Sequence, residues 1–137
     1  MRESGILMHI TSLPSPYGVG TMGKAAYQFI DFLHKSGQHC WQSLPVTPTG
    51  YGDSPYQSCS TYAGNHYLID LDLLVEEGLL KKSEITKIGW SDDPTRVNFG
   101  KLYNHRLDVL ELAFRRFCPD EAFDTFCHSN DSWIWAS

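Results

Sequence analysis

The sequence predicts an α/β fold whose strands run parallel. Two short and mainly apolar segments, residues 5–10 (GILMHI) and 39–44 (HCWQSL), have the composition of strands that are buried on both faces, as in a parallel sheet. Between them, residues 24–36 place apolar side chains at helical spacing. A strand, a helix and a second strand in this order predict a right-handed crossover between parallel strands.

Glycine and proline punctuate this βαβ unit. Residues 11–23 (TSLPSPYGVGTMG) contain two prolines and three glycines, and we expect them to form a long loop. The helix that follows ends where Gly37 can adopt the left-handed conformation of a helix cap. Its apolar face consists of Ala26, Phe29, Ile30 and Leu33.

Helices are expected to dominate the rest of the chain. Residues 67–74 (YLIDLDLL) alternate acidic and apolar residues, as a strand does, and one or two helical turns are expected over residues 82–88. Residues 97–117 keep a three-four apolar spacing and form the longest predicted helix. Pro119 interrupts it, and a shorter helix is expected over residues 120–128.

Composition favours a globular protein that binds a neutral or small polar ligand. The 137 residues leave room for one domain, and a hydrophobic content of 42% is typical of globular chains. A net charge of -5 and the absence of a basic cluster argue against nucleic acid or an anionic membrane as partner. With no bilayer-spanning apolar segment and no signal peptide in the sequence, a cytoplasmic protein is expected.

The four cysteines do not form a metal site or a disulfide framework. Cys40, Cys59, Cys118 and Cys127 are not arranged in CxxC pairs, and no histidine stands at metal-ligand spacing from them. Cys40 and Cys127 are expected to be small core residues. Cys59 would be a nucleophile only beside a base, and none is visible locally. We therefore expect neither a metal nor another cofactor.

Residues 49–65 (TGYGDSPYQSCSTYAGN) are the strongest candidate for a functional site. They follow the second strand without a helical or alternating period, and long ordered loops in such places usually serve a site. A tyrosine ring suits a sugar, because its flat apolar face has a polar hydroxyl at the edge. The alternative is a turn whose tyrosines fill the core. The candidate substrate-binding residues in this loop are Tyr51, Asp53, Ser54, Tyr56 and Gln57.

His9 and two aspartates outside this loop allow further hypotheses. His9 ends the first strand, so a place on the ligand side competes with a hydrogen-bonded position in the core. On a strand, Asp70 and Asp72 would lie about 7 Å apart on one side, as paired glycosidase carboxylates could. A solvated edge is favoured, since Glu76 and Glu77 follow them. Asp53 is the better-placed acid, although one acid cannot perform the two-carboxylate mechanism.

The letters GxGxxG at residues 18–23 allow a third reading, a nucleotide-binding βαβ unit. In dinucleotide-binding folds the glycines follow the strand at once, and an acidic residue ends the second strand. Here residues 11–17 intervene, and the second strand ends at Leu44 and Pro45. We therefore expect the glycines to allow a tight turn and a close approach to the first helix.

Several segments together carry a resemblance to a known family. The string GYGDSPYQ at residues 50–57 is highly specific, and the matches are strong from about Ser4 to Leu80 and weaker to about Trp133. Other matching segments are SGIL (4–7), TSLP (11–14), PYGVG (16–20), FIDFL (29–33), AGN (63–65) and LIDL (68–71). In these segments the chain resembles the amino-terminal part of the amylomaltases, the 4-alpha-glucanotransferases of glycoside hydrolase family seventy-seven.

The resemblance implies a (β/α)8 TIM-barrel enzyme that cuts an α-1,4-glucan, such as a malto-oligosaccharide, and transfers the glucosyl segment with retention through a covalent intermediate. In that family Ser54 and Tyr56 belong to the donor site, and Tyr51 resembles a tyrosine at a further glucan-contacting surface. The family's catalytic carboxylates come from later strands, and a complete barrel takes about 250 residues.

We therefore expect residues 1–137 to be the truncated amino-terminal portion of the barrel domain, with the first βα units and inserted helices. No catalytic residue is expected in this chain, and the chain alone should be inactive. The other hypothesis is a non-catalytic glucan-binding fragment.

Overall fold

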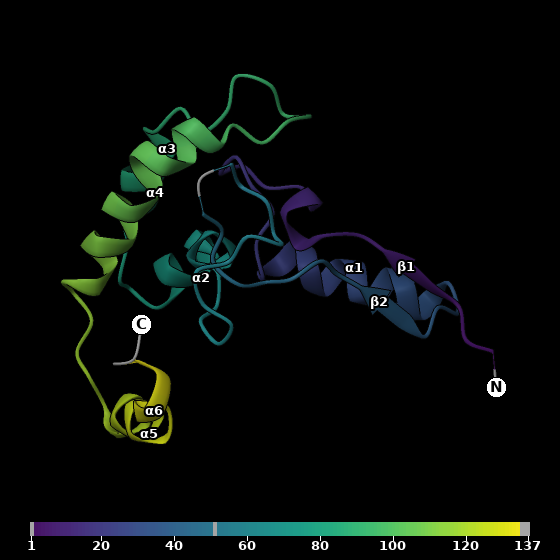
Figure 1. Ribbon diagram of the computed structural model, residues 1–137. Coiled ribbons are helices and arrows are strands. Elements are labelled where there is room, and N and C mark those ends of the chain that lie inside the picture. Colours follow the sequence, from purple (N-terminus) through teal and green to yellow (C-terminus); the bar gives the residue numbers. More distant parts are fainter. Residues whose placement is uncertain (1, 51, 135–137) are drawn as a thin grey trace.

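The computed structural model describes residues 2–50 and 52–134, and it contains the expected βαβ unit (Figure 1). Strand β1 (Gly5–Leu7) pairs in parallel with β2 (Cys40–Gln42), with Ile6 opposite Trp41. The connection between the strands includes the 3-10 helix η1 (Ile10–Ser12) and helix α1 (Lys24–Lys35). The predicted α/β class and parallel pairing are therefore confirmed.

Both strands are shorter and more exposed than predicted. In each strand only the central residue is half-buried, and the residues on either side of it are exposed. Helix α1 covers one face, where Phe29 packs edge to face on Trp41 with ring centroids 4.9 Å apart. Burial on both faces needs neighbours at both edges and cover on both sides. In the described part of the chain the sheet consists of β1 and β2 alone, so the prediction of fully buried strands, and of Cys40 in the core, was wrong.

The loop of residues 11–23 lies against the core and needs its glycines. A Cβ atom on Gly20 would stand 2.1 Å from the carbonyl oxygen of Ile10, so only glycine allows the loop to pass η1. Gly18 has φ +78° and packs on Trp90. The expected close approach is present, but its main partners are η1 and Trp90 rather than α1.

The alternating segment after the candidate site is helical. Its residues form the 3-10 helix η2 (His66–Leu68) and helix α2 (Leu71–Glu76). Asp70 caps α2, because its Oδ1 accepts hydrogen bonds from the amides of Asp72 at 2.9 Å and Leu73 at 3.1 Å. The capping hydrogen bonds of Asp70 therefore favour a helix more strongly than the short alternating pattern favours a strand. The prediction of a strand over residues 67–74 was wrong.

The remaining helices follow the predicted pattern with changed ends. The long predicted helix is α4, which begins after Asn98, whose side chain accepts from the amide of Lys101 at 3.1 Å. Figure 1 shows α4 along one side of the molecule, with α5 and α6 beyond its carboxyl end and away from the strands. The bounds are α3 (Lys82–Thr86), α4 (Phe99–Phe114), α5 (Glu121–Ser129) and α6 (Asp131–Ile134).

The main core lies among α2, α3, α4 and the loop of residues 11–23 rather than on the sheet. Leu71, Ile85 and Leu102 are fully buried and come from three different helices. Arg106 of α4 is buried with them. A smaller cluster joins η1, α1 and Leu68. These two clusters hold both ends of the connection that leads from β2 to α2.

An ion pair ties α3 to the segment after α4 and gives a pH-dependent prediction. Arg116 donates from Nη1 and Nη2 to the two carboxylate oxygens of Glu84, at 2.8 and 2.7 Å. The amide of Lys81 donates to the same carboxylate at 2.8 Å. Hydrogen bonds from the Arg116 side chain, and then from the Lys81 amide, lower the pKa of Glu84 from 4.5 to about 2.

Because the folded state lowers this pKa, the stability that the pair contributes is complete above about pH 4.5 and is lost as the pH falls toward 2. We expect Glu84→Gln to lower the urea midpoint of unfolding at about pH 7 and to have much less effect at about pH 2. Equal losses at both pH values would show that the carboxylate charge does not matter.

Candidate functional site

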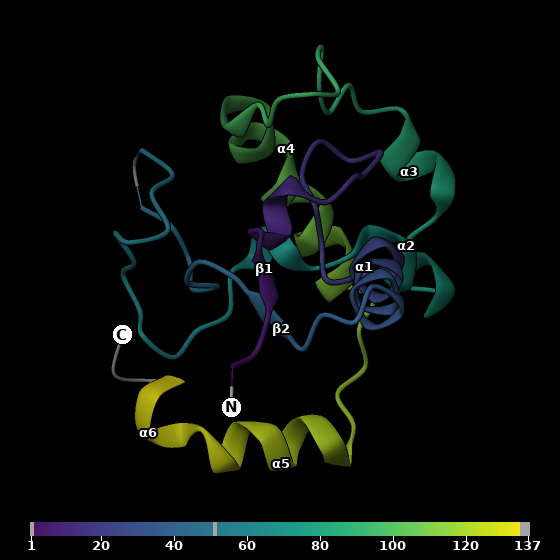
Figure 2. The same ribbon diagram turned by 90° about the vertical axis from the view of Figure 1, so that its right-hand side faces the viewer.

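The loop of residues 49–65 is closed by backbone contacts. Thr49 and Ser58 form an antiparallel bridge, and the Gly50 amide donates to the Gln57 carbonyl at 3.0 Å. These contacts fold the segment between them into a tight turn. Figure 2 shows the connection that follows β2 on one side of the two strands and α1 on the other. The loop thus projects on the side of the sheet that α1 leaves free.

The exit of the loop is fastened to the core. The Asn65 amide donates to the Val46 carbonyl at 2.9 Å, and the Asn65 side chain accepts from the Tyr67 amide at 2.9 Å. Arg106 Nη2 then donates to the carbonyl of Tyr67 at 3.1 Å and to that of Ile69. Burial lowers the pKa of Arg106 to about 10, which leaves it charged at neutral pH. The base of the loop is therefore fixed by buried polar contacts.

The turn at the tip has an uncommon backbone. Asp53 has φ +56°, a left-handed conformation that aspartate tolerates better than most residues, and Gly52 before it has φ +100°. The Asp53 amide donates to the Gly50 carbonyl at 3.2 Å, and the Gln57 amide donates to the Ser54 carbonyl at 3.1 Å. Burial raises the pKa of the Asp53 carboxyl. Such locally strained turns are frequent at functional sites.

The candidate side chains described in this turn are accessible. Tyr56 is 73% exposed, Gln57 is exposed, and Asp53 and Ser54 are half-buried. The alternative of a tyrosine that fills the core therefore does not hold for Tyr56. Tyr51 lies outside the described residues.

Tyr62 is a loop residue that the sequence reasoning did not single out. Its side chain is 73% exposed, and its ring stacks on Trp133 with centroids 6.1 Å apart and an interplanar angle of 27°. The contact joins the loop to α6. The aromatic content of the loop was the available signal, but a partner 71 positions away in the sequence gives no local pattern.

His9 lies where the sequence placed it, just beyond the end of β1. Its Nδ1 is 3.1 Å from Oγ of Ser43, which follows β2, so a hydrogen bond joins the ends of the two parallel strands. His9 is half-buried, and burial lowers its pKa. Among the described residues, no hydrogen bond links His9 to Asp53 or Tyr56.

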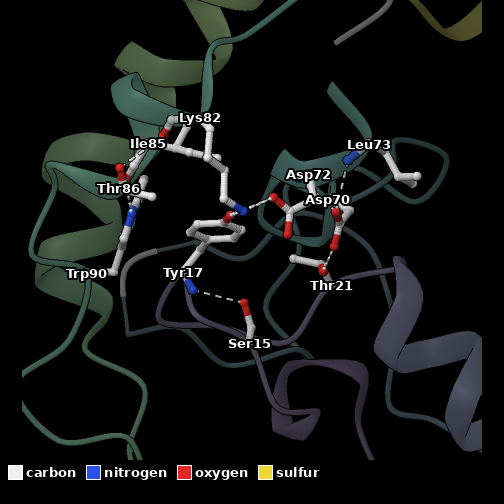
Figure 3. Close-up of polar contacts among 10 residues, drawn as sticks. All are labelled: Ser15, Tyr17, Thr21, Asp70, Asp72, Leu73, Lys82, Ile85, Thr86 and Trp90. Carbon is white, nitrogen blue, oxygen red and sulfur yellow. Dashed lines mark hydrogen bonds and ion pairs between the residues drawn. The ribbon is translucent and has the colours of Figure 1, made fainter. Parts of the chain in front are cut away.

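Asp70 and Asp72 have structural partners and do not form a pair of free carboxylates (Figure 3). Besides capping α2, Asp70 accepts a hydrogen bond from Thr21. Tyr17 donates to Asp72 at 2.6 Å, and Lys82 donates to Asp72 and to the Tyr17 hydroxyl, each at 2.5 Å. Burial acts to raise the pKa of Asp72, but hydrogen bonds from Lys82 and Tyr17 outweigh it and lower that pKa. Neither residue lies on a strand edge.

Comparison with known proteins decides the family. A family model described as 4-alpha-glucanotransferase matches residues 8–136. The chain belongs to the 4-alpha-glucanotransferase family. The resemblance read from the sequence is confirmed.

The similarity to individual 4-alpha-glucanotransferases covers almost the whole chain. The Streptococcus pneumoniae enzyme is 47% identical over 136 residues, which cover 97% of this chain and 27% of that protein. The Thermus thermophilus enzyme is 45% identical over an alignment of 143 residues with the same coverage. The structure of an amylomaltase from Streptococcus agalactiae in complex with acarbose matches with a TM-score of 0.90 and 45% identity, over 96% of this chain and 27% of that chain. This chain therefore spans about a quarter of the length of these 4-alpha-glucanotransferases.

Metal and membrane features are not evident in the described part of this family member. Residues 2–50 and 52–134 contain no cluster of three or more His, Cys, Asp or Glu side chains that could hold a metal ion. None of the described helices is long and apolar enough to cross a membrane. Cys59 is exposed in the loop.

Proposed function

We propose that this chain is the sugar-contacting, amino-terminal part of a 4-alpha-glucanotransferase. Such an enzyme cuts α-1,4-glucans and transfers the released segment, with retention, to a glucose or glucan acceptor. Family membership supports the reaction class. The observation that carries the proposal for this chain is the 73% exposed Tyr56, which lies on a turn closed by the Thr49–Ser58 bridge after the second parallel strand. Loops in that position form the active-site face of a (β/α)8 barrel.

The turn offers the groups that a glucose ring needs. The exposed face of Tyr56 stacks against the apolar C–H face of the sugar. The Asp53 carboxylate accepts hydrogen bonds from sugar hydroxyls, and Ser54 and Gln57 can both donate and accept them. Because the base of the loop is fixed before the sugar arrives, little conformational entropy is lost on binding. Tyr51 would add a second stacking surface.

The chemical step requires groups beyond this turn. Retaining glycoside cleavage uses two carboxyl groups about 5 to 5.5 Å apart. Asp53 is the one acidic residue between positions 49 and 65. Asp70 and Asp72 are already engaged in hydrogen bonds, Asp70 with the backbone amide of Asp72 and Asp72 with Lys82. We therefore assign the nucleophile and the acid/base to later strands of the barrel, of which β1 and β2 are the first two. This chain alone then binds glucan without transferring it.

A matched pair of tyrosine variants tests the sugar-binding role. Tyr56 and Tyr103 are about equally exposed, at 73% and 74%, but Tyr103 lies on α4 rather than in the loop. We expect Tyr56→Ala to weaken binding of maltoheptaose about tenfold or more, equivalent to about 1.4 kcal/mol. Tyr103→Ala should leave binding unchanged. Titration in dilute solution, followed by tryptophan fluorescence, measures both, and equal affinities for the two variants would contradict the role of Tyr56.

A transfer assay completes the test. We expect the chain alone to release no glucose from maltotriose. Glucose release at an enzyme-like rate would overturn the assignment of the catalytic carboxylates to later strands. A chain that binds maltoheptaose but never supports transfer, even with the remaining polypeptide of a family member, would instead be a non-catalytic glucan-binding protein.

A further inference from the structure

A groove of about 600 Å³ lies along α4, facing α2 and the segment that follows α2. Its lining is almost entirely apolar, with polar side chains only from His66 and Glu111. Leu107 is 52% exposed and Phe114 is 68% exposed. The apolar lining includes Leu74, Leu79, Leu107, Leu110, Phe114 and Phe117.

Helix α4 presents two apolar stripes rather than one. The first is buried in the core of this chain and includes Leu102 and Val109, and Ala113 lies between the core and the groove. The second runs through Leu107, Leu110 and Phe114, at positions i, i+3 and i+7, and continues to Phe117 beyond the end of the helix. A surface helix of a complete domain has one apolar stripe, whereas a helix that is apolar on two sides is covered on both. The second stripe therefore predicts a further layer of polypeptide.

We propose that this groove docks the polypeptide that makes up the other three quarters of a 4-alpha-glucanotransferase. The chain corresponds to 27% of the Streptococcus agalactiae amylomaltase and superposes on it with a TM-score of 0.90. In that protein the same fold is therefore part of a molecule almost four times as long. This inference rests on family membership and on the groove, and it does not depend on sugar binding by the loop.

The chemistry of the groove defines what docks in it. The partner inserts apolar side chains between Leu107 and Phe114, which removes their exposed surface from water. His66 lies at the groove, and its buried Nε2 has no hydrogen-bond partner among the described residues. The partner therefore also supplies a polar group at that end. A malto-oligosaccharide does not fit this description, because its hydroxyl groups would meet a nearly all-apolar wall.

Co-expression with the missing part of a relative tests the proposal. The tagged chain is produced together with the portion of the Streptococcus agalactiae amylomaltase that this chain does not cover, so that the two can assemble while folding. We expect a one-to-one complex on size-exclusion chromatography. Phe114→Glu and Leu107→Glu should each reduce the recovered complex about tenfold or more, because each places a carboxylate in an apolar interface.

Tyr103→Glu is the matched control, since Tyr103 is 74% exposed on the same helix and does not line the groove. Circular dichroism establishes that the variants keep their helices, and the exposed Phe114 can change without disturbing the core. Failure of the wild-type chain to form the complex would overturn the proposal, and so would equal recovery for Phe114→Glu and Tyr103→Glu. A dimer of this chain that Phe114→Glu abolishes would assign the groove to a second copy instead.

Maltotriose assays on the purified complex separate this inference from the proposed function. A complex that depends on Phe114 but transfers no glucosyl segment supports the docking surface and counts against the enzyme assignment. If Phe114→Glu and Leu107→Glu leave the complex intact and the complex transfers glucosyl segments, the enzyme assignment is supported and the docking surface is contradicted.

Discussion

Arg106→Ala is expected to lower the free energy of unfolding by about 3 kcal/mol, because it leaves buried backbone carbonyls without a donor and opens a cavity. The wild-type side chain is fully buried, and its Nη2 donates to the carbonyls of Tyr67 and Ile69. Its guanidinium carbon also lies 5.7 Å from the centre of the Trp90 ring. These contacts join α4 to the segment just beyond the candidate loop.

Two further variants separate charge and hydrogen bonding from volume. Arg106→Lys keeps a positive charge and a hydrogen-bond donor, but it loses the contact of the guanidinium with the Trp90 ring. Arg106→Met fills the space without donating. It also removes a buried charge, whose burial is itself costly.

We therefore expect the loss of stability to increase from lysine to methionine to alanine, measured by urea unfolding. Loss of binding to maltoheptaose by a folded Arg106→Met protein, with recovery in Arg106→Lys, would show that Arg106 also positions the loop. A methionine variant as stable as the wild type would contradict the role of the hydrogen bonds.

Leu102→Ala is expected to lower the free energy of unfolding by about 3 kcal/mol, which is a substantial part of the stability of a small domain. Leu102 is fully buried on the core face of α4, where it packs in the cluster with Leu71 and Ile85. Removing its side chain forfeits the burial of that apolar surface and leaves a cavity that rigid helices cannot close.

Leu107→Ala provides the matched control, since the same residue type on the same helix is 52% exposed. We expect it to cost less than about 1 kcal/mol in the isolated chain. Equal losses for the two leucines would show that the core is not where the structure places it. In the complex with the remaining polypeptide, the cost of Leu107→Ala should rise, because docking buries that side chain.

The sequence predicted the positions of the helices and strands better than it predicted their burial. The βαβ unit and α4 follow from local apolar periodicity, which the fold preserves. Burial of β1 and β2 could not be judged locally, because it depends on neighbouring strands and covering layers. Residues 67–74 were misread because alternation over a few residues is weaker than the capping hydrogen bonds of Asp70.

The apolar periodicity of α4 also did not distinguish the two apolar faces of the helix. Leu102 and Val109 point into the core, whereas Leu107 and Phe114 line the groove. Both sets keep a three-four spacing, so the pattern alone does not separate them. Their separation became visible only when the helix was placed against α2 and α3.

In the candidate site, too, local features could be predicted from the sequence and contacts between distant residues could not. The turn of residues 52–57 was recognisable from its glycine, proline and tyrosine content. Arg106, Ser43 and the partner of Tyr62 were not, because each acts across a large sequence separation. A buried arginine in the middle of a helix has the same sequence signature as a solvated one.

We expect the turn of residues 52–57 to contact the sugar. Acarbose added to the isotope-labelled chain, with the backbone amide resonances followed by NMR, tests it most directly. We predict that the shifting amides cluster at residues 52–57 and in neighbouring parts of the loop. Shifts confined to the groove of α4, with residues 52–57 unchanged at saturating acarbose, would contradict it.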